Sequence, residues 1–177
     1  AHGHALVLFT SYAAMSAVKE RLREQDLAYP LFTLGRNAVH TTKQFKNTPG
    51  GVLLATGAAW EGFDFPGDCV SLLVIPRLPF PIPDALKEKE REQYPTLHSF
   101  LRGIVVPEMQ IKLKQGFGRA IRLETDTCVV AILDERAARD QRYWKDLPEM
   151  PVTQDIHRVE AFIRSVKPDG YFQEGAA

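Results

Sequence analysis

The chain has 177 residues, of which 45% are hydrophobic and 25% charged, a composition typical of globular domains. Its 22 basic residues balance 22 acidic ones, so the strongly basic charge of many nucleic-acid-binding domains is missing and any such contact must be local. We expect one domain over residues 1–177, with a core that needs neither disulfide bonds nor metal. Cys69 and Cys128 lack CxxC spacing, which indicates buried thiols in a reducing compartment rather than a disulfide or a metal site.

No stretch approaches the roughly 18 apolar residues of a membrane span. The opening segment AHGHALVLFT also lacks the basic region and the long apolar core of a signal peptide. We therefore expect a cytoplasmic location and no membrane partner. We interpret His2 and His4, on a short polar terminus, as a linker remnant rather than as a metal-binding tract.

In the first third of the chain, short apolar runs alternate with helical patterns. Ala5–Phe9 predicts a buried strand, the polar residues Thr10, Ser11 and Tyr12 end it, and a periodic stretch to about Asp26 predicts a helix. The next unit has a strand at Leu31–Leu34, a short helix at Thr41–Lys46, and a Gly50-Gly51 turn into a strand at Val52–Ala55.

Two further apolar runs, Val70–Ile75 and Thr127–Leu133, predict buried strands. Strands that are apolar throughout and separated by helices favour a mostly parallel sheet covered on both faces, which is the α/β class. Such sheets bind ligands beyond the carboxyl ends of their strands. The segments that follow Phe9 and Ala55 therefore occupy the expected functional edge.

Between the last two strands, at about residues 77–107, the pattern breaks into a proline-rich and helical insertion. Asp84 is a good N-cap for the charged helix that follows, whose alternating charges indicate a solvated face. Near the end of the chain, Thr153–Val166 predicts a helix that packs on the core, and we expect residues 173–177 to be disordered.

The segment QGFGRAIR, residues 115–122, has polar residues three and four apart within a helical pattern. One predicted face is apolar, with Met109, Leu113, Phe117 and Ile121. The other is polar, with Lys112, Gln115, Gly118, Arg119 and Arg122. Two arginines with a glycine before the first suit phosphate recognition, although the spacing alone also fits an ordinary surface helix.

QGFGRAIR matches Q-x-x-G-R-x-I-R, the motif VI of DinG/XPD-like superfamily 2 DNA helicases, and other segments resemble that family in the same order. LVLFTSY resembles motif IV, and GVLLATGAAWEGFDFPG resembles motif V with its W-E-G-x-D-F-P-G signature. RLPFPIPD, ILDER and the stretch Tyr143–Pro148 resemble connecting segments. The resemblance begins at Leu6 and is strong because several motifs occur in one order.

The resemblance implies a RecA-like three-layer α/β/α domain that is the second of two motor domains. In this family ATP with Mg²⁺ lies between the two, and the first domain supplies the phosphate loop and the metal-binding acid. This chain has no G-x-x-x-x-G-K-[ST] sequence, so we expect it to be inactive alone. The implied partners are the N-terminal RecA-like domain of the same polypeptide and single-stranded DNA. An iron–sulfur cluster, where the family has one, belongs to the first domain.

Site residues follow from the same resemblance. Arg119 and Arg122 are the candidates for the arginine finger at the γ-phosphate, with Arg122 favoured, while Gln115 orients near the γ-phosphate or the attacking water. Gly118 allows the nucleotide to approach, and Asp64 with Glu61 and Gly62 contacts the ribose or couples ATP to DNA. The residues expected to hold DNA phosphates are Thr10, Ser11, Tyr12, Thr56 and Gly57.

Several alternatives remain open at the level of sequence. Tyr12 or Trp60 could stack on a base, or pack in the core as aromatic residues more often do. The chain could also be a non-catalytic nucleic-acid-binding or regulatory module that retains the fold. Motifs that contact the backbone do not separate a DNA helicase from an RNA helicase, or from a DinG-like chain fused to a nuclease.

Overall fold

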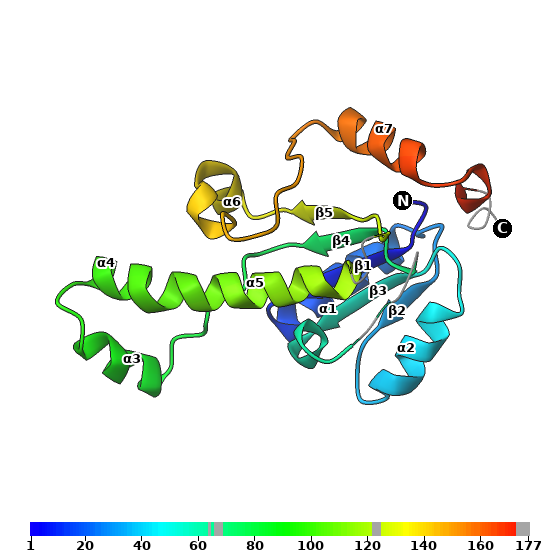
Figure 1. Cartoon of the computed structure of the whole chain (residues 1–177). Helices are drawn as coiled ribbons and strands as arrows, with labels where there is room; N and C mark the ends of the chain where they lie inside the picture. Colours follow the sequence, from blue (N-terminus) through cyan, green and yellow to red (C-terminus); the bar gives the residue numbers. More distant parts are fainter. Residues whose placement is uncertain (64, 66–68, 122–124, 173–177) are drawn as a thin grey trace.

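The structure, a computed structural model, describes residues 1–63, 65, 69–121 and 125–172. Its centre is a five-stranded sheet of order β2-β3-β1-β4-β5, in which every described pair of strands is parallel (Figure 1). The strands are β1 (Ala5–Phe9), β2 (Leu31–Thr33), β3 (Val52–Thr56), β4 (Leu72–Ile75) and β5 (Val129–Ile132). The predicted α/β class with a parallel sheet is confirmed.

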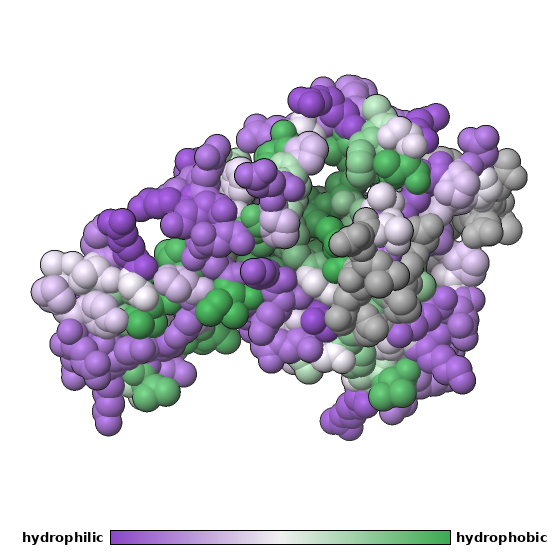
Figure 2. Space-filling model, viewed as in Figure 1, coloured by the Kyte–Doolittle hydropathy of each residue, from purple (hydrophilic) through white to green (hydrophobic). Residues whose placement is uncertain are grey.

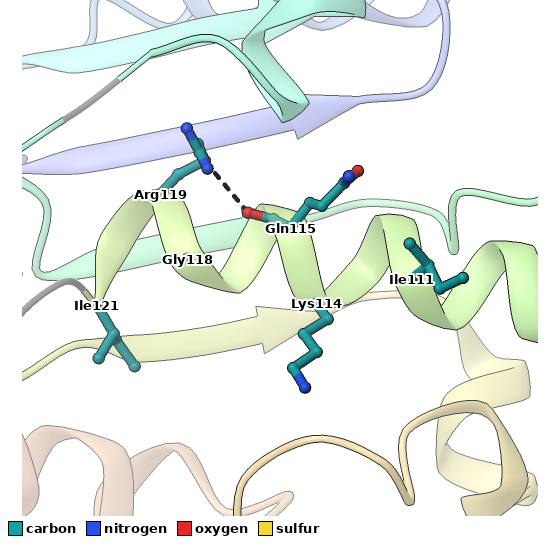
Figure 3. A pocket seen from close by; sticks show the side chains of 6 residues that line it. All are labelled: Ile111, Lys114, Gln115, Gly118, Arg119 and Ile121. Atoms are coloured by element: carbon teal, nitrogen blue, oxygen red, sulfur yellow. Dashed lines mark hydrogen bonds between the residues drawn. The ribbon is translucent and has the colours of Figure 1, made fainter.

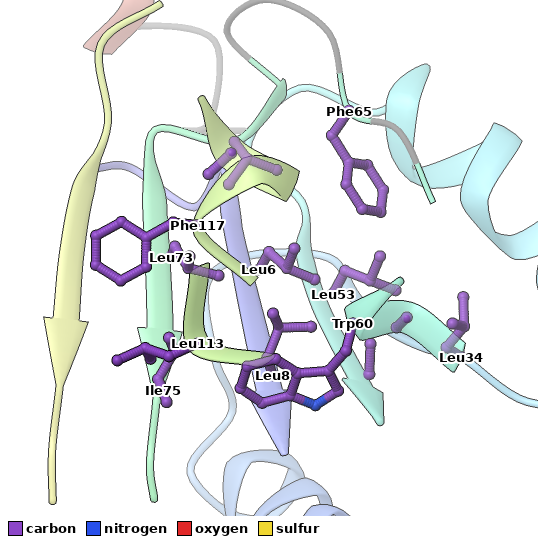
Figure 4. Close-up of a cluster of buried hydrophobic side chains, with 14 of the residues drawn as sticks. Leu6, Leu8, Leu34, Leu53, Trp60, Phe65, Leu73, Ile75, Leu113 and Phe117 are labelled. Atoms are coloured by element: carbon purple, nitrogen blue, oxygen red, sulfur yellow. The ribbon is translucent and has the colours of Figure 1, made fainter. Parts of the chain in front are cut away.

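Helices cover both faces of the sheet, because side chains alternate along each strand. On one face Ala5 and Phe9 pack with Met15 of α1 (Tyr12–Glu24). On the other, Leu6 and Leu8 pack with α5 (Val106–Ala120), and α2 (Ala38–Lys46) contributes Phe45 to the same cluster. Figure 4 shows Leu113 and Phe117 of α5 over the strands. The predicted three layers are confirmed.

The remaining elements lie mainly beyond the carboxyl ends of the strands or near the C-terminus (Figure 1). They are the α-helices α3 (Ala85–Glu92), α4 (Leu97–Phe100), α6 (Glu135–Arg139) and α7 (Ile156–Val166), the 3₁₀ turns η1 (Gly57–Trp60), η4 (Gln141–Tyr143) and η5 (Asp169–Phe172), and the π-helical segment η3 (Leu101–Val105).

The predicted insertion at residues 77–107 is not separate from the long helix. Elements α4, η3 and α5 run without a break from Leu97 to Ala120, and this rod extends well beyond the sheet (Figure 1). Asp84 caps α3 as predicted, since its side chain accepts a hydrogen bond from the Lys87 N–H at 2.8 Å. The rod itself begins with a capping box formed by Thr96 and Ser99.

Some predicted boundaries were wrong. Helix α2 begins at Ala38 rather than Thr41, and β4 begins at Leu72 rather than Val70. The prediction that Ile121 extends the buried face of the long helix was also wrong, because Ile121 has an extended backbone (φ −123°, ψ 109°) and is 39% exposed. The chain leaves the helix there in order to reach β5, which begins at Val129.

The two ends of the described chain contact each other. His4 is buried, its Nε2 accepts a hydrogen bond from the Gly50 N–H at 3.1 Å, and its ring stacks on Tyr171 with a centroid distance of 4.4 Å. The Tyr171 hydroxyl also hydrogen-bonds the Ser71 hydroxyl. The interpretation of His4 as a linker remnant was therefore wrong, because His4 is part of the fold. Its partners Gly50 and Tyr171 are distant in sequence, so the local pattern did not indicate this role.

The predicted C-terminal helix is present as α7, but it begins at Ile156 rather than Thr153. Ile163 is buried, whereas Ile156 and Phe162 are exposed, so the helix packs through a narrower face than expected. Residues 173–177, predicted to be disordered, lie outside the described residues.

No helix in the described part of the chain is both long enough and apolar enough to cross a membrane. Cys69 and Cys128 are both reduced thiols rather than a disulfide pair. Burial raises the pKa of the Cys128 thiol to about 12, which keeps it protonated and chemically inert near neutral pH.

Candidate functional site

Two of the predicted nucleic-acid-binding segments meet at the carboxyl edge of the sheet. Strands β1 and β3 pair so that Phe9 and Thr56 lie opposite each other, which brings the turn after one strand next to the turn after the other. Thr10 and Ser11 are exposed, and Tyr12 is 67% exposed. Gly57 has φ +61°, and a side chain at that position would lie 3.8 Å from the Tyr12 hydroxyl. The two turns therefore form one edge.

Thr10, Ser11, Tyr12 and Gly57 together are called the carboxyl-edge turn from here on. Ser11 is the N-cap of α1, and its Oγ accepts a hydrogen bond from the Ala14 N–H at 3.2 Å. The N-terminus of a helix carries a partial positive charge and free N–H groups, both of which favour anions. This edge thus combines hydroxyl groups with a helix N-terminus.

Thr56, predicted to join this edge, points its hydroxyl inward. Its Oγ1 donates a hydrogen bond to the Phe9 carbonyl at 2.9 Å, and its side chain is buried. The indole Nε1 of Trp60 donates to the same carbonyl, also at 2.9 Å. Because Trp60 is only 1% exposed, buried packing rather than base stacking is its role in this structure. Tyr12 remains exposed.

The predicted polar stripe is present on the exposed side of α5. Gln115, Gly118 and Arg119 line a hollow of about 450 Å³, together with Ile111, Lys114 and Ile121 (Figure 3). Figure 3 shows Gln115 and Arg119 pointing to one side of the helix and Lys114 to the other. A side chain at Gly118 would meet no atom within 4 Å, so the helix surface there is open to a ligand.

Arg119 joins this stripe to the turn after η1. Its Nη1 donates hydrogen bonds to the carbonyls of Phe63 at 2.8 Å and Glu61 at 3.4 Å. Its Nε donates to the Gln115 carbonyl at 3.2 Å, one helical turn back. Gly62 lies between the two bonded carbonyls, and a side chain there would come within 3.1 Å of the Ala58 carbonyl oxygen. The stripe and the Glu61–Phe63 turn, far apart in sequence, are therefore in direct contact.

Two predicted site residues, Asp64 and Arg122, lie outside the described residues. Phe63 accepts the hydrogen bond from Arg119, Phe65 is buried in the core, and Ile121 borders the hollow on α5. Phe63 and Ile121, which precede Asp64 and Arg122 in the sequence, thus lie on the two segments that Arg119 joins.

Gly116 is a residue whose importance the sequence patterns did not reveal. A side chain there would put its Cβ 2.7 Å from Cζ3 and 2.9 Å from Cε3 of Trp60, which is closer than atoms can pack. Glycine in a helix interior costs roughly 1 kcal/mol relative to alanine, which is a usable sequence signal for such a close approach.

Asp134 is a second residue that sequence analysis missed, within the ILDER segment. Its carboxylate is buried and accepts hydrogen bonds from the N–H of Leu78 at 3.0 Å and from Nε of Arg136 at 2.9 Å. The hydrogen bonds from Arg136 hold the pKa of Asp134 at about 2. Arg136 in turn lies over the Phe80 ring at 4.6 Å. The carboxylate joins the end of β5 to the loop after β4.

Among residues 1–63, 65, 69–121 and 125–172, no group of three His, Cys, Asp or Glu side chains could hold a metal ion. The carboxyl-edge turn and α5 offer hydroxyl groups, backbone N–H groups and the Arg119 guanidinium, all of which suit phosphate groups.

A parallel sheet with helices on both faces, and an arginine-bearing helix packed against the turn after β3, are the features expected of a RecA-like helicase domain. Residues 1–151 match the helicase C-terminal domain family, and the chain belongs to that family. The order of the helicase-like motifs along the sequence agrees with this match.

The chain is 36% identical over 168 residues to the ATP-dependent DNA helicase YoaA of Haemophilus influenzae, covering 92% of this chain and 26% of YoaA. It is 33% identical over 171 residues to the ATP-dependent helicase DinG of Mycobacterium tuberculosis H37Rv, covering 93% of this chain and 26% of DinG. It therefore spans about a quarter of these relatives. The solved structure "XPD_APO" shares the fold, with a TM-score of 0.62 at 22% identity over 82% of this chain and 31% of that one.

Proposed function

We propose that this chain is the second motor domain of an ATP-dependent DNA helicase of the DinG/XPD type, acting on DNA in the bacterial cytoplasm. Membership of the helicase C-terminal domain family and the names of its relatives support this proposal. In the complete polypeptide a first RecA-like domain supplies the phosphate loop, the Mg²⁺ ligands and, where present, an iron–sulfur cluster. The isolated chain then has no ATPase activity.

The contact between Arg119 and the Glu61–Phe63 turn is the observation that carries the proposal. It brings together the two segments expected to hold ATP, beside the open surface at Gly118. ATP bound by the first domain would lie against this stripe, with Gln115 near the γ-phosphate or its attacking water. Asp64, with Glu61 and Gly62, would contact the ribose.

Arg122 is assigned as the arginine finger. Arg119 already donates hydrogen bonds to the Gln115, Glu61 and Phe63 carbonyls, so its Nε and Nη1 are engaged in holding the turn after η1 against α5. An arginine that stabilises charge on the γ-phosphate commonly raises the rate by about 10³ to 10⁵. Arg119 then shapes the site and adds charge to it.

Single-stranded DNA would bind along the carboxyl-edge turn. Hydroxyl groups, backbone N–H groups and the N-terminus of α1 can hold phosphates without a large basic patch, which fits a net charge of zero. Thr56 supports this edge from inside through the Phe9 carbonyl. Closing and opening of the ATP cleft would move the two DNA-holding domains along the strand in steps.

The test uses the complete polypeptide with Arg122→Ala. We expect loss of ATP turnover by about 10³-fold or more, with single-stranded DNA affinity retained, because the role proposed for Arg122 is at the nucleotide and not at the DNA. Arg139→Ala is the matched control, since Arg139 pairs with Glu135 on the exposed surface of α6. Turnover that persists in Arg122→Ala would contradict the assigned role, and ATPase activity of the isolated chain would contradict the two-domain site.

A further inference from the structure

Trp60 contacts both candidate sites from within the core. Its Nε1 donates a hydrogen bond at 2.9 Å to the carbonyl of Phe9, the residue directly before Thr10. Thr56 donates to the same oxygen at 2.9 Å. Two donors, one from the last residue of β3 and one from η1, thus fix the peptide group at which the carboxyl-edge turn begins. The orientation of Thr10 and Ser11 depends on this carbonyl.

The other end of the same indole lies against α5. The ring atoms Cζ3 and Cε3 are so close to Gly116 that a Cβ there would lie at 2.7 and 2.9 Å from them, and at 3.4 Å from Leu8. Gly116 directly follows Gln115 of the stripe that faces the nucleotide in the proposed function. Figure 4 shows the Trp60 ring among the strand residues Leu8 and Leu53.

We propose that Trp60 is a positioning residue that sets the carboxyl-edge turn relative to the nucleotide-facing stripe of α5. Trp60 is enclosed by core residues, and close-packed interiors transmit displacement rather than absorb it. A shift of α5 at Gly116 therefore displaces the indole, and its N–H carries the Phe9 carbonyl with it. The inference rests on the proposed function for the identity of the two ligands, but the mechanical link rests on these contacts alone.

The test uses this chain with three single substitutions. Trp60→Phe removes the N–H donor and shortens the ring, Gly116→Ala places a Cβ against the ring, and Gly35→Ala is a control because no atom lies within 4 Å of its Cβ position. We expect Trp60→Phe and Gly116→Ala, but not Gly35→Ala, to shift the backbone amide resonances of Thr10 and Ser11. Both should also weaken binding of an oligo-dT strand by about fivefold, the effect of roughly one hydrogen bond.

A double substitution separates positioning from simple loss of packing. The shorter ring in Trp60→Phe/Gly116→Ala makes room for the new Cβ, so the double variant should fold and bind oligo-dT as Trp60→Phe does. This remains informative if Gly116→Ala alone fails to fold. Thr56→Val removes the other donor to the Phe9 carbonyl without touching Gly116, so its effect and that of Gly116→Ala should be coupled rather than additive, because both act on the same carbonyl.

The outcomes distinguish the inference from the proposed function. Unshifted Thr10 and Ser11 resonances in folded Trp60→Phe and Gly116→Ala would overturn the positioning role, as would additive effects of these two changes on oligo-dT affinity. If the unsubstituted chain does not bind oligo-dT, the proposed DNA contact is wrong, and the amide resonances still decide whether Trp60 links α5 to the turn.

Discussion

A single carboxylate, that of Asp134, joins two segments that follow neighbouring strands. It accepts hydrogen bonds from the Leu78 N–H and from the Arg136 guanidinium and backbone N–H. Its side chain is nearly inaccessible to water, whereas that of Arg136 is half exposed. Removing one partner of such a group leaves the others unsatisfied, which costs more than a surface ion pair contributes. Asp134 should therefore matter more than the exposed ion pairs.

We predict that Asp134→Asn destabilises the chain by about 2 kcal/mol at neutral pH. The folded-state pKa of Asp134 is about 2, against 3.8 for an unperturbed carboxyl, so its contribution is fully present above pH 3.8 and is lost as the pH falls towards 2. Urea unfolding of the unsubstituted chain and of Asp134→Asn should be measured between pH 7 and pH 2.5. The difference between their free energies of unfolding should shrink as the pH falls below 3.8.

Asp140→Asn provides the comparison, because Asp140 pairs with Arg142 on the surface. Its substitution should have a much smaller effect at every pH. A loss of stability in Asp134→Asn that does not change with pH would mean that shape, rather than charge, determines the contribution of Asp134.

Helix α1 starts at the same residues that form the carboxyl-edge turn, so its cap and its proposed ligand contact use the same side chain. We predict that Ser11→Ala lowers the free energy of unfolding by about 1 kcal/mol, because the Ala14 N–H loses its acceptor. Ser11→Asp should keep the stability, since aspartate is an equally good N-cap, but should weaken oligo-dT binding more than Ser11→Ala does through repulsion of phosphate.

Thermal unfolding and fluorescence anisotropy with labelled oligo-dT measure the two effects separately. Each substitution is the control for the other. Ser11→Ala removes the cap and adds no charge, whereas Ser11→Asp keeps the cap and adds a negative charge. If Ser11→Asp binds oligo-dT as tightly as the unsubstituted chain, phosphate does not approach the N-terminus of α1.

Elements with a strong local signal could be predicted from the sequence. Strand β1 matches its predicted bounds, because a short apolar run ended by polar residues has few other solutions, and Asp84 caps α3 as its residue type indicates. The end of α5 could not be predicted, since Ile121 fits the helical period and leaves the helix only because the chain must return to β5.

The same distinction holds for the candidate site. The position of the turns after β1 and β3 at the carboxyl edge followed from the parallel sheet alone, whereas their meeting depends on the pairing of β1 with β3. The inward hydroxyl of Thr56 did not, because it depends on the Phe9 carbonyl of a neighbouring strand. The bonds from Arg119 to the Glu61 and Phe63 carbonyls likewise require the packing of α5 against η1. The local sequence pattern therefore predicts which segments form the candidate site. Tertiary contacts determine which of their polar groups point towards a ligand and which are engaged within the fold.

At the scale of the whole molecule, the C-terminal segment packs against the N-terminal segment. Tyr171 stacks on His4 and hydrogen-bonds Ser71, which directly precedes β4. The family match ends at residue 151, so α7 and η5 lie beyond it. Tyr171 of η5 therefore links segments at the amino edge of the sheet, and we expect the docking of α7, which precedes η5, to maintain these contacts.

We predict that Ile163→Ala destabilises the chain by about 2 kcal/mol or more, because Ile163 is 8% exposed and is the residue through which α7 is most deeply buried. Ile156→Ala is the matched control on the same helix, since Ile156 is 72% exposed and its substitution should change stability by less than about 0.5 kcal/mol. Urea unfolding followed by circular dichroism measures both. Undocking of α7 should also release Tyr171, so the His4 ring resonances should move in Ile163→Ala and stay in place in Ile156→Ala. Equal stability of the two variants would show that α7 is held through η5 and Tyr171 rather than through its own buried face.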